Sequence, residues 1–463
     1  ILKKGGNAID AAVAVGFALA VTSSSNGNLG GGGFLVASLI DGASFTLDHR
    51  EKAPSSSNRD MFLDDSGNVN PGMSLYSRAG SGVPGTVDGL IRILKDHGSG
   101  KISIRQVLAP AIRLAEKGFL LSHYEARRFN AYKAFFEKNE AAADIFIRKD
   151  DRPWKEKDRF IQRDLSKTLK RIAKYGRDGF YTGPVAKMIV EEMKRGNGLI
   201  SMDDLSNYSS KYRDPVTGSY KGYEVISMGP PSSGGALLIN MLNMLELYGK
   251  DSLEWNSSDY VHILTEIERR AYADRAEHMG DPDYWDVPLE MFRSKEYAKG
   301  RTIDIDINRA TPSDQVYAGK PDGYESPETT HYSVVDQWGN AVSVTTTINL
   351  GYGNGCVVKG AGFFLNNEMD DFSSKPGTPN MYGLIGGSAN KIEPQKRMLS
   401  SMTPTIVEKD NNLFMTLGSP GGSRIITSVL QTILNVHEFS MTMNEAVNSP
   451  RFHHQWMPDT IKI

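Results

Sequence analysis

The order of apolar and polar positions divides the chain into segments that predict helices and strands. Residues 8–22 are apolar on nearly all sides and follow Asn7, a typical helix N-cap, so we expect a helix buried between two layers. A glycine-rich stretch at 23–33 comes next, and residues 34–42 and 44–50 are two strand-like runs joined by a glycine-containing turn. The start of the chain therefore predicts a helix, a glycine loop and a hairpin.

Amphipathic helical patterns fill much of the middle of the chain. A Ser-x-x-Gln capping box opens a helix predicted at 103–118, and residues 123–215 contain charged amphipathic helices typical of an outer layer. Residues 222–249 predict a strand, a Pro/Gly/Ser loop and a helix, and a further long helix is predicted at 260–278. The next segment, 282–328, is polar and has little periodicity, so we expect a surface segment or linker there.

A β-hairpin is predicted where the character of the chain changes at Thr329. Residues 330–336 and 340–348 alternate polar and apolar positions and flank a Gln-Trp-Gly turn. If the turn centres on Trp338, facing residues are equidistant from it, which places Thr329 opposite Thr347. Facing Cβ atoms are roughly 4.5–5.5 Å apart, so the two hydroxyls are expected within hydrogen-bonding reach. A register slip of one residue would remove this contact.

Strand patterns continue beyond the hairpin, near residues 356–366, 403–408 and 413–418. A final helical pattern covers residues 425–439. No internal repeat of 20 to 50 residues is present, so a solenoid or propeller is not expected.

Composition and charge restrict the class of protein. The 463 residues are 39% hydrophobic and 23% charged, which allows a sizeable core and predicts a soluble globular protein. Lys+Arg 53 nearly balance Asp+Glu 55, so nucleic acid is not an expected partner. The longest apolar stretch, 11–21, is much shorter than the about 20 residues of a membrane helix, so no membrane span is predicted. The single cysteine, Cys356, excludes an intrachain disulfide and a cysteine-based metal site.

The threonines of the predicted hairpin are candidates for nucleophilic chemistry, although threonine is also common in half-buried strands for packing reasons. Periodicity by itself favours the packing role. A hydroxyl is a weak nucleophile without a neighbouring base, and the chain has no Gly-x-Ser-x-Gly elbow or Ser-His-Asp pattern in a suitable context. A threonine released as a chain N-terminus would supply its own α-amine as the base.

Two glycine-rich segments are candidate binding loops. Residues 417–431 predict a strand, a tight glycine turn and a helix N-terminus, whose free N–H groups suit an oxyanion; an ordinary strand-to-helix connection is the alternative. A phosphate loop is disfavoured because the segment lacks Gly-Lys-Ser/Thr. In residues 27–34 the predicted helix precedes the glycines, so nucleotide binding is disfavoured and a tight turn beside a buried core is expected.

Two polar clusters follow the hairpin. Residues 366–372 include Glu368, Asp370 and Asp371, and residues 399–402 supply two adjacent serine hydroxyls. Acidic residues near a turn are usually solvated, so by itself the acidic cluster predicts an exposed turn. No histidine lies at ligand spacing nearby, so no metal site is predicted.

Ten segments of the chain resemble, in order, the signature motifs of γ-glutamyltranspeptidases, a family of N-terminal-nucleophile hydrolases. They are GGNAIDAAVAV, GNLGGGGF, DHREKAP, GVPGTVDGL, PPSSGG, RAYADRAE, ETTHYSV, LNNEMDDFS, LSSMTPT and GSPGGSRIIT. The resemblance implies an α+β fold, a four-layer αββα sandwich, formed by a precursor that is cleaved between Glu328 and Thr329. It implies a large subunit, 1–328, intertwined with a small subunit, 329–463, and it places the family's outermost segments beyond both ends of this chain.

The resemblance also implies roles for individual residues. Released Thr329 would be the nucleophile, Thr347 would hydrogen-bond it, and the backbone N–H groups of Gly421 and Gly422 would form the oxyanion hole. The α-carboxylate of the donor would be held by Arg50, Ser400 and Ser401. Its α-ammonium would be held by Asn349, Glu368 and Asp371. Residues 376–390 resemble the lid loop of many bacterial members, with Tyr382 as the gating residue.

The activity implied is that of a glutathione hydrolase and γ-glutamyltransferase that needs no cofactor and no metal. Its donors would be glutathione or glutamine, its acceptors water, amino acids or dipeptides, and its location periplasmic or secreted. A cephalosporin acylase and a poly-γ-glutamate-processing enzyme share the nucleophile and remain alternatives, although Arg50 with Asp371 favours a glutamyl donor. A noncatalytic, uncleaved glutamyl-peptide-binding protein is the alternative outside enzymes.

Overall fold

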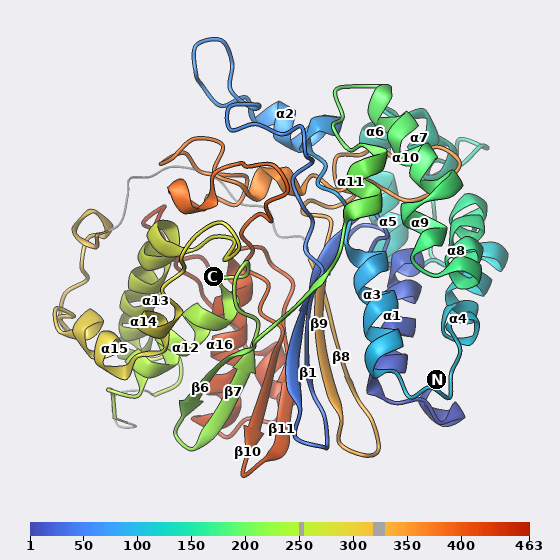
Figure 1. Ribbon diagram of the computed structural model, residues 1–463. Helices are drawn as coiled ribbons and strands as arrows, with labels where there is room; N and C mark the ends of the chain where they lie inside the picture. The colour runs from blue at the N-terminus through green and yellow to red at the C-terminus, as the bar shows by residue number, and fades with distance from the viewer. Residues whose placement is uncertain (250–253, 318–328) are drawn as a thin grey trace.

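Two β-sheets lie face to face at the centre of the structure, a computed structural model that describes residues 1–249, 254–317 and 329–463 (Figure 1). Helices cover the outer face of each sheet, so the layers follow the order αββα, and the predicted α+β sandwich is confirmed. The five-stranded sheet has the order β5 (Lys211–Arg213), β2 (Ser44–Asp48), β1 (Gly32–Ser38), β9 (Ala341–Thr347) and β8 (Thr330–Val335). The four-stranded sheet has the order β11 (Asn412–Leu417), β10 (Thr405–Lys409), β7 (Tyr223–Ser227) and β6 (Val216–Tyr220).

A separate group of helices packs on each sheet (Figure 1). The five-stranded sheet is covered by α1 (Ala8–Thr22), α3 (Thr86–His97), α4 (Ile104–Lys117) and α8 (Arg163–Tyr175), and the four-stranded sheet by α12 (Gly234–Leu245), α13 (Ser258–His278) and α16 (Arg424–His437). The remaining α-helices and strands that the structure describes are α2 (Pro71–Tyr76), α5 (His123–Ala131), α6 (Lys133–Phe136), α7 (Glu140–Phe146), α9 (Asp178–Tyr181), α10 (Gly183–Lys194), α11 (Met202–Asn207), α14 (Leu289–Arg293), α15 (Lys295–Thr302), α17 (Met443–Asn448), and the ribbon of β3 (Phe119–Leu120) and β4 (Arg159–Phe160). Among the described residues, no helix combines the length and apolarity needed to cross a membrane.

The first helix confirms the capping prediction. The Asn7 side chain accepts from the Asp10 N–H at 3.0 Å, and the Asp10 carboxylate accepts from the Asn7 N–H at 2.9 Å, a reciprocal capping box. The N–H of Ala8 donates to the Asp336 carboxylate in the β8–β9 turn at 2.9 Å. The start of α1 is therefore tied to the hairpin that follows Thr329.

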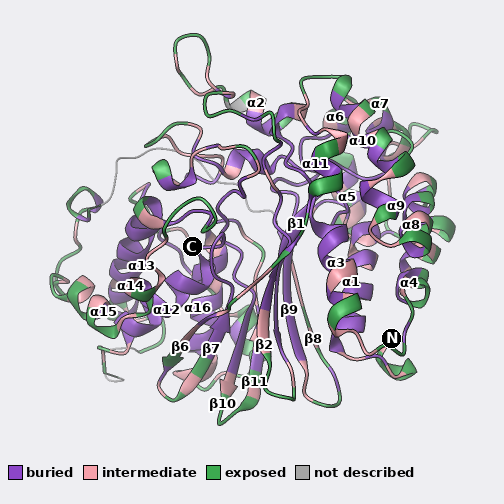
Figure 2. Cartoon of the chain, in the orientation of Figure 1, coloured by how far each residue is buried: buried purple, intermediate pink, exposed green. Residues whose placement is uncertain are grey.

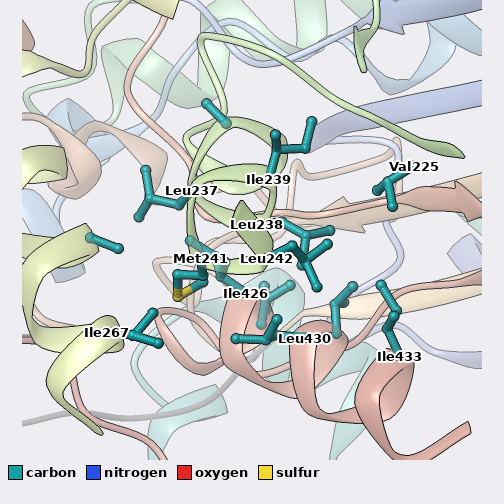
Figure 3. Packing of buried hydrophobic residues seen from close by; sticks show 14 of the residues in the cluster. Val225, Leu237, Leu238, Ile239, Met241, Leu242, Ile267, Ile426, Leu430 and Ile433 are labelled. Atoms are coloured by element: carbon teal, nitrogen blue, oxygen red, sulfur yellow. The ribbon is translucent and has the colours of Figure 1, made fainter. Parts of the chain in front are cut away.

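The strand β1 is buried on both sides and divides the interior into two cores (Figure 2). Phe34 and Val36 point between the sheets and join the core beneath α12 and α16, part of which is drawn in Figure 3. Leu35 and Ala37 point the other way, into the core beneath α1 and α4. Truncating the fully buried Phe34 to alanine would cost about 3–5 kcal/mol of folding free energy, because a cavity would remain at the sheet interface.

The β8–β9 hairpin has the predicted register. Thr330 pairs with Thr346, and the pairing continues without a shift to Val335 and Ala341. The Asp336 carboxylate closes the turn by accepting from the Trp338 N–H at 2.9 Å. Thr329 immediately precedes β8, so the same register continues toward Thr347.

Three local predictions are wrong. Residues 356–366 form no strand but a tight turn with a single bridge between Val357 and Phe364, because two glycines there have left-handed φ angles of 81° and 80°. The edge strand β5 lies within the segment expected to be helical, and β6 follows it. In the polar segment 282–328, the part up to residue 317 contains α14 and α15; buried Phe292 and Ala298 attach them to the core beneath α12, a tertiary contact that periodicity does not reveal.

Candidate active site

One small pocket gathers most of the predicted site residues. The predicted residues on its wall are Arg50, Thr329, Thr347, Asn349, Glu368, Asp371, Tyr382, Ser400, Ser401 and Gly422. Gly421 precedes Gly422 on the same turn, and Glu328 lies outside the described residues. The sheets, the lid segment and the α16 turn thus meet at one site.

The two hairpin threonines lie on the pocket wall, where Thr329 is 6% exposed and Thr347 4% exposed. The Thr329 carbonyl accepts from the Asn26 side chain at 3.3 Å, and the Thr347 hydroxyl accepts from the Asn349 N–H at 2.8 Å. Because that bond occupies a lone pair of Thr347, the hydroxyl proton remains available to a neighbouring acceptor. This arrangement suits a hydroxyl that assists a nucleophile.

The glycines of residues 27–34 permit close approach to these strands. A Cβ at Gly31 would lie 2.1 Å from the Thr347 carbonyl oxygen, and one at Gly33 would lie 2.3 Å from that of Thr345. Both contacts are far shorter than real Cβ contacts, so only glycine fits. The expectation of a tight glycine turn beside the site is confirmed.

The turn before α16 presents unbonded N–H groups. Gly421 and Gly422 have φ angles of 134° and 56°, which favour glycine. Across the described ranges, neither glycine N–H donates a hydrogen bond. Ser423 provides no side-chain cap for α16, so the partial positive charge of the helix N-terminus also faces this turn. Such a turn can stabilise an oxyanion.

The acidic cluster is buried around Arg50, so the expectation of an exposed, solvated turn is wrong. The two terminal nitrogens of fully buried Arg50 donate to Glu368 and Asp371, and the Glu51 carboxylate lies 3.6 Å from the guanidinium. Burial alone lowers the pKa of Arg50, but the attraction of Glu368, Asp371 and Glu51 outweighs it and raises that pKa. The ion cluster therefore keeps Arg50 charged inside the protein.

Two buried acceptors near this cluster have no partner among the described residues. In the described part of the chain, buried Asn349 Oδ1 and Glu368 Oε2 accept no hydrogen bond. Burial raises the pKa of Glu368 well above its ordinary range and raises the pKa of Asp371, although Arg50 opposes both shifts. Unpaired buried acceptors are costly, and a cationic ligand would satisfy them.

Tyr382 and Leu384 of the predicted lid segment line the pocket. The Tyr382 hydroxyl donates to the Asn349 carbonyl at 3.0 Å, and its ring lies over Gly422, where a Cβ would be 2.7 Å from Tyr382 Cδ1. The Asn380 side chain donates to Asp371 at 3.2 Å. The lid is thus attached to both the glycine turn and the acidic cluster.

Sequence reasoning missed three pocket neighbours. Asn26 contacts the Thr329 carbonyl, and Ser423 and Arg275 line the pocket. Arg275 lies in the RAYADRAE segment, but the helical pattern there did not identify the face that meets the pocket. Arg275 could have been identified as a candidate because it is the second arginine of the RAYADRAE motif.

Comparison with known proteins decides the family. A family model described as gamma-glutamyltranspeptidase matches residues 1–463. The chain belongs to this family. The γ-glutamyltranspeptidase resemblance predicted from the motifs is therefore confirmed.

Relatives of this γ-glutamyltranspeptidase support the assignment. The chain is 48% identical over its full length to the glutathione hydrolase proenzyme of Escherichia coli (strain K12), covering 80% of that protein. The crystal structure of Helicobacter pylori gamma-glutamyltranspeptidase is 44% identical, with a TM-score of 0.67 over 68% of this chain and 90% of that one. A cephalosporin acylase from Bacillus halodurans, at 24% identity and a TM-score of 0.84 over 98% of this chain and 80% of that one, shares the fold.

Proposed function

We infer that this γ-glutamyltranspeptidase is a glutathione hydrolase and γ-glutamyltransferase whose nucleophile is Thr329. The observation that carries the proposal is that Thr329 lines the same pocket as the Arg50 cluster and Gly422. A nucleophile, a charged recognition site and free N–H groups are thus adjacent. Relatives named glutathione hydrolase proenzyme support the substrate class.

In the proposed acylation, the Thr329 hydroxyl oxygen attacks the γ-carbonyl carbon of the donor, and the α-amine of released Thr329 takes the hydroxyl proton. The oxyanion forms at the N–H groups of Gly421 and Gly422, a type of contact worth about 10²–10³ in rate. Collapse breaks the C–N bond, and the leaving amine takes the proton from the α-ammonium. Water or the amine of an amino acid or dipeptide then attacks the resulting γ-glutamyl ester, and the α-amine takes a proton from this nucleophile. As the ester C–O bond breaks, that proton passes to the Thr329 oxygen and restores the hydroxyl.

The charged groups would recognise the free α-substituents of the glutamyl donor. Asn349 Oδ1 and Glu368 Oε2, both unbonded among the described residues, together with Asp371 suit the α-ammonium. The hydroxyls of Ser400 and Ser401, with Arg50, suit the α-carboxylate. Charged groups of both signs on the pocket wall favour L-glutamyl donors over purely apolar acyl groups.

We propose that cleavage between Glu328 and Thr329 releases the nucleophile without separating the subunits. The strand pairs β1–β9 and β7–β10 each join one strand from 1–328 to one from 329–463. These ladders and the shared core would hold the two pieces together after the cut. By family resemblance we also propose a periplasmic or secreted location, to be tested by fractionating cells that make the full-length protein.

Turnover of a chromogenic γ-glutamyl anilide, with and without glycylglycine, tests the proposal. We expect aniline release that the dipeptide accelerates, release by Thr329→Ser, and none by Thr329→Ala. The alternative function, that of an acylase, is suggested by the similarity of this chain to the Acylase ACY 1 proenzyme of Pseudomonas sp. (strain SE83), at 35% identity. Turnover of a glutaryl anilide in preference to the γ-glutamyl one would favour it, and wild-type turnover by Thr329→Ala would refute the nucleophile assignment.

A further inference from the structure

Arg275 is a buried cation on the pocket wall with no carboxylate partner in the part of the chain that the structure describes. It projects from α13, is 4% exposed, and lies within salt-bridge distance of no carboxylate in residues 1–249, 254–317 and 329–463. Its hydrogen bonds run instead from Nε to Ser233 Oγ at 2.9 Å and from Nη2 to Ser401 Oγ at 3.3 Å. Arg50, by contrast, already donates to two carboxylates.

The electrostatics of Arg275 indicate a site prepared for an anion. Burial lowers the pKa of Arg275 to about 10, whereas Tyr272 and Asp371 raise it and Arg50 lowers it further. Arg275 remains charged at neutral pH, but its charge is desolvated and, among the described residues, is opposed only by the more distant Asp371. A buried cation of this kind is stabilised by a bound anion.

The hydrogen bonds of the two adjacent serines determine where their protons point. Ser401 Oγ accepts from Arg275, and Ser400 Oγ accepts from the Met402 N–H at 3.1 Å. A hydroxyl carries one proton, and when a donor occupies its lone pair, that proton turns toward another acceptor. Both hydroxyls lie on the pocket wall, so both are arranged to donate to a ligand.

Arg50 has little capacity left for an incoming carboxylate. Besides its two carboxylate partners, Arg50 donates from Nε to the Met398 carbonyl and from Nη2 to the Leu399 carbonyl, each at 3.3 Å. Most of its five N–H groups are therefore occupied. A second cation near the serines would supply the charge that Arg50 shares with Glu368 and Asp371.

We propose that Arg275 is a positioning residue of the donor-binding site, which orients the Ser401 hydroxyl toward the donor α-carboxylate and adds a second positive charge there. This inference rests on the γ-glutamyl donor specificity proposed above. A purely structural role, fastening α13 to Ser233, would predict loss of stability without any dependence on the donor's carboxylate.

The test compares Arg275→Gln, Arg275→Lys and Ser401→Ala on a γ-glutamyl anilide and on its α-carboxamide analogue. Since a hydrogen bond to a charged group is being lost, we expect Arg275→Gln to raise KM for the carboxylate donor about tenfold or more, with kcat within about threefold. The analogue should show no comparable rise. Arg275→Lys, which keeps the charge, should recover at least half of the lost affinity.

A double-mutant cycle tests the route through Ser401. If Arg275 acts through that hydroxyl, Arg275→Gln in the Ser401→Ala background should add less than about threefold to KM. Full additivity, equal effects on both donors, or wild-type KM in Arg275→Gln would overturn the proposal. Should Arg275→Gln fail to fold, Arg275→Lys and Ser401→Ala still decide it, because equal KM changes for both donors in these variants would also refute it.

Failure of this inference is distinguishable from failure of the proposed function. If γ-glutamyl turnover and an effect of Arg50→Lys on KM persist while Arg275→Gln behaves as wild type, only the role of Arg275 is refuted. If the wild-type protein turns over no γ-glutamyl donor, the proposed function fails as well.

Discussion

Replacing Asp371 by asparagine tests the recognition of the donor's ammonium group. The substitution keeps the shape of the side chain and removes one negative charge from the pocket wall. It also weakens the pair with Arg50 Nη2, while the amide can still contact the Asn380 side chain of the lid. The change therefore acts mainly on charge rather than on packing.

The expected magnitude follows from the loss of one charged hydrogen bond. Such a bond contributes about 1.5–3 kcal/mol, which corresponds to a rise in KM of about 10- to 150-fold. Because the ammonium is bound equally in the ground state and the transition state, kcat should change much less than KM. Asn349 Oδ1 and Glu368 Oε2 remain as acceptors, so binding should be weakened and not abolished.

The assay uses a γ-glutamyl anilide and a glutaryl anilide, which lacks the ammonium group. Asp371→Asn should lose affinity for the first donor only. Asp370→Asn is the matched control, because neighbouring Asp370 is buried but bonds Ser74 Oγ at 2.7 Å and the Met381 N–H at 3.0 Å and does not line the pocket. A KM within threefold of wild type for Asp371→Asn, or equal losses for both donors, would refute the ammonium assignment.

Three further predictions concern the nucleophile, the oxyanion turn and pH. Thr347→Ala should slow processing or turnover at least tenfold, whereas Thr347→Ser should not; wild-type kinetics in the alanine variant would contradict the hairpin argument. Gly422→Ala should lower kcat about 10²-fold or more, since a Cβ would meet the Tyr382 ring at 2.7 Å and φ is 56°; unchanged kcat would remove this turn from catalysis. Burial lowers the pKa of His49 to about 4. As the pH falls below 6.5, the unfolded chain therefore binds a proton at His49 before the folded chain does. The free energy of unfolding should fall by about 2 kcal/mol between pH 7 and pH 5 from this group alone. His49→Gln should flatten that part of the melting-temperature profile, and an identical profile would contradict the assignment.

Local patterns predicted those parts of the fold that short-range contacts determine. The hairpin register followed from alternation around Trp338, and the structure pairs Thr330 with Thr346 as expected. The Asn7 N-cap of α1 and the Ser103–Gln106 capping box of α4 followed from short-range signals in the sequence. The small helices α14 and α15 were missed because buried contacts, rather than periodicity, specify them.

Partners distant in sequence could not be predicted from local patterns. Arg50 pairs with Glu368, which lies 318 positions away in the sequence, and no local pattern of charges indicates that the acidic turn is buried. The roles of these residues came from family resemblance alone. Arg275 had no such assignment, and its place beside Ser401 follows only from how α13 packs.

Intact mass under denaturing conditions, followed by N-terminal sequencing of the smaller species, tests the central claim most directly. The measurement should use freshly purified protein of full natural length, with Thr329→Ala as the control. We expect two fragments from the wild type, the smaller beginning Thr-Thr-His-Tyr, and one uncut chain from the variant. A wild-type chain that stays whole yet turns over γ-glutamyl donors would contradict the account, because its nucleophile would have no free α-amine.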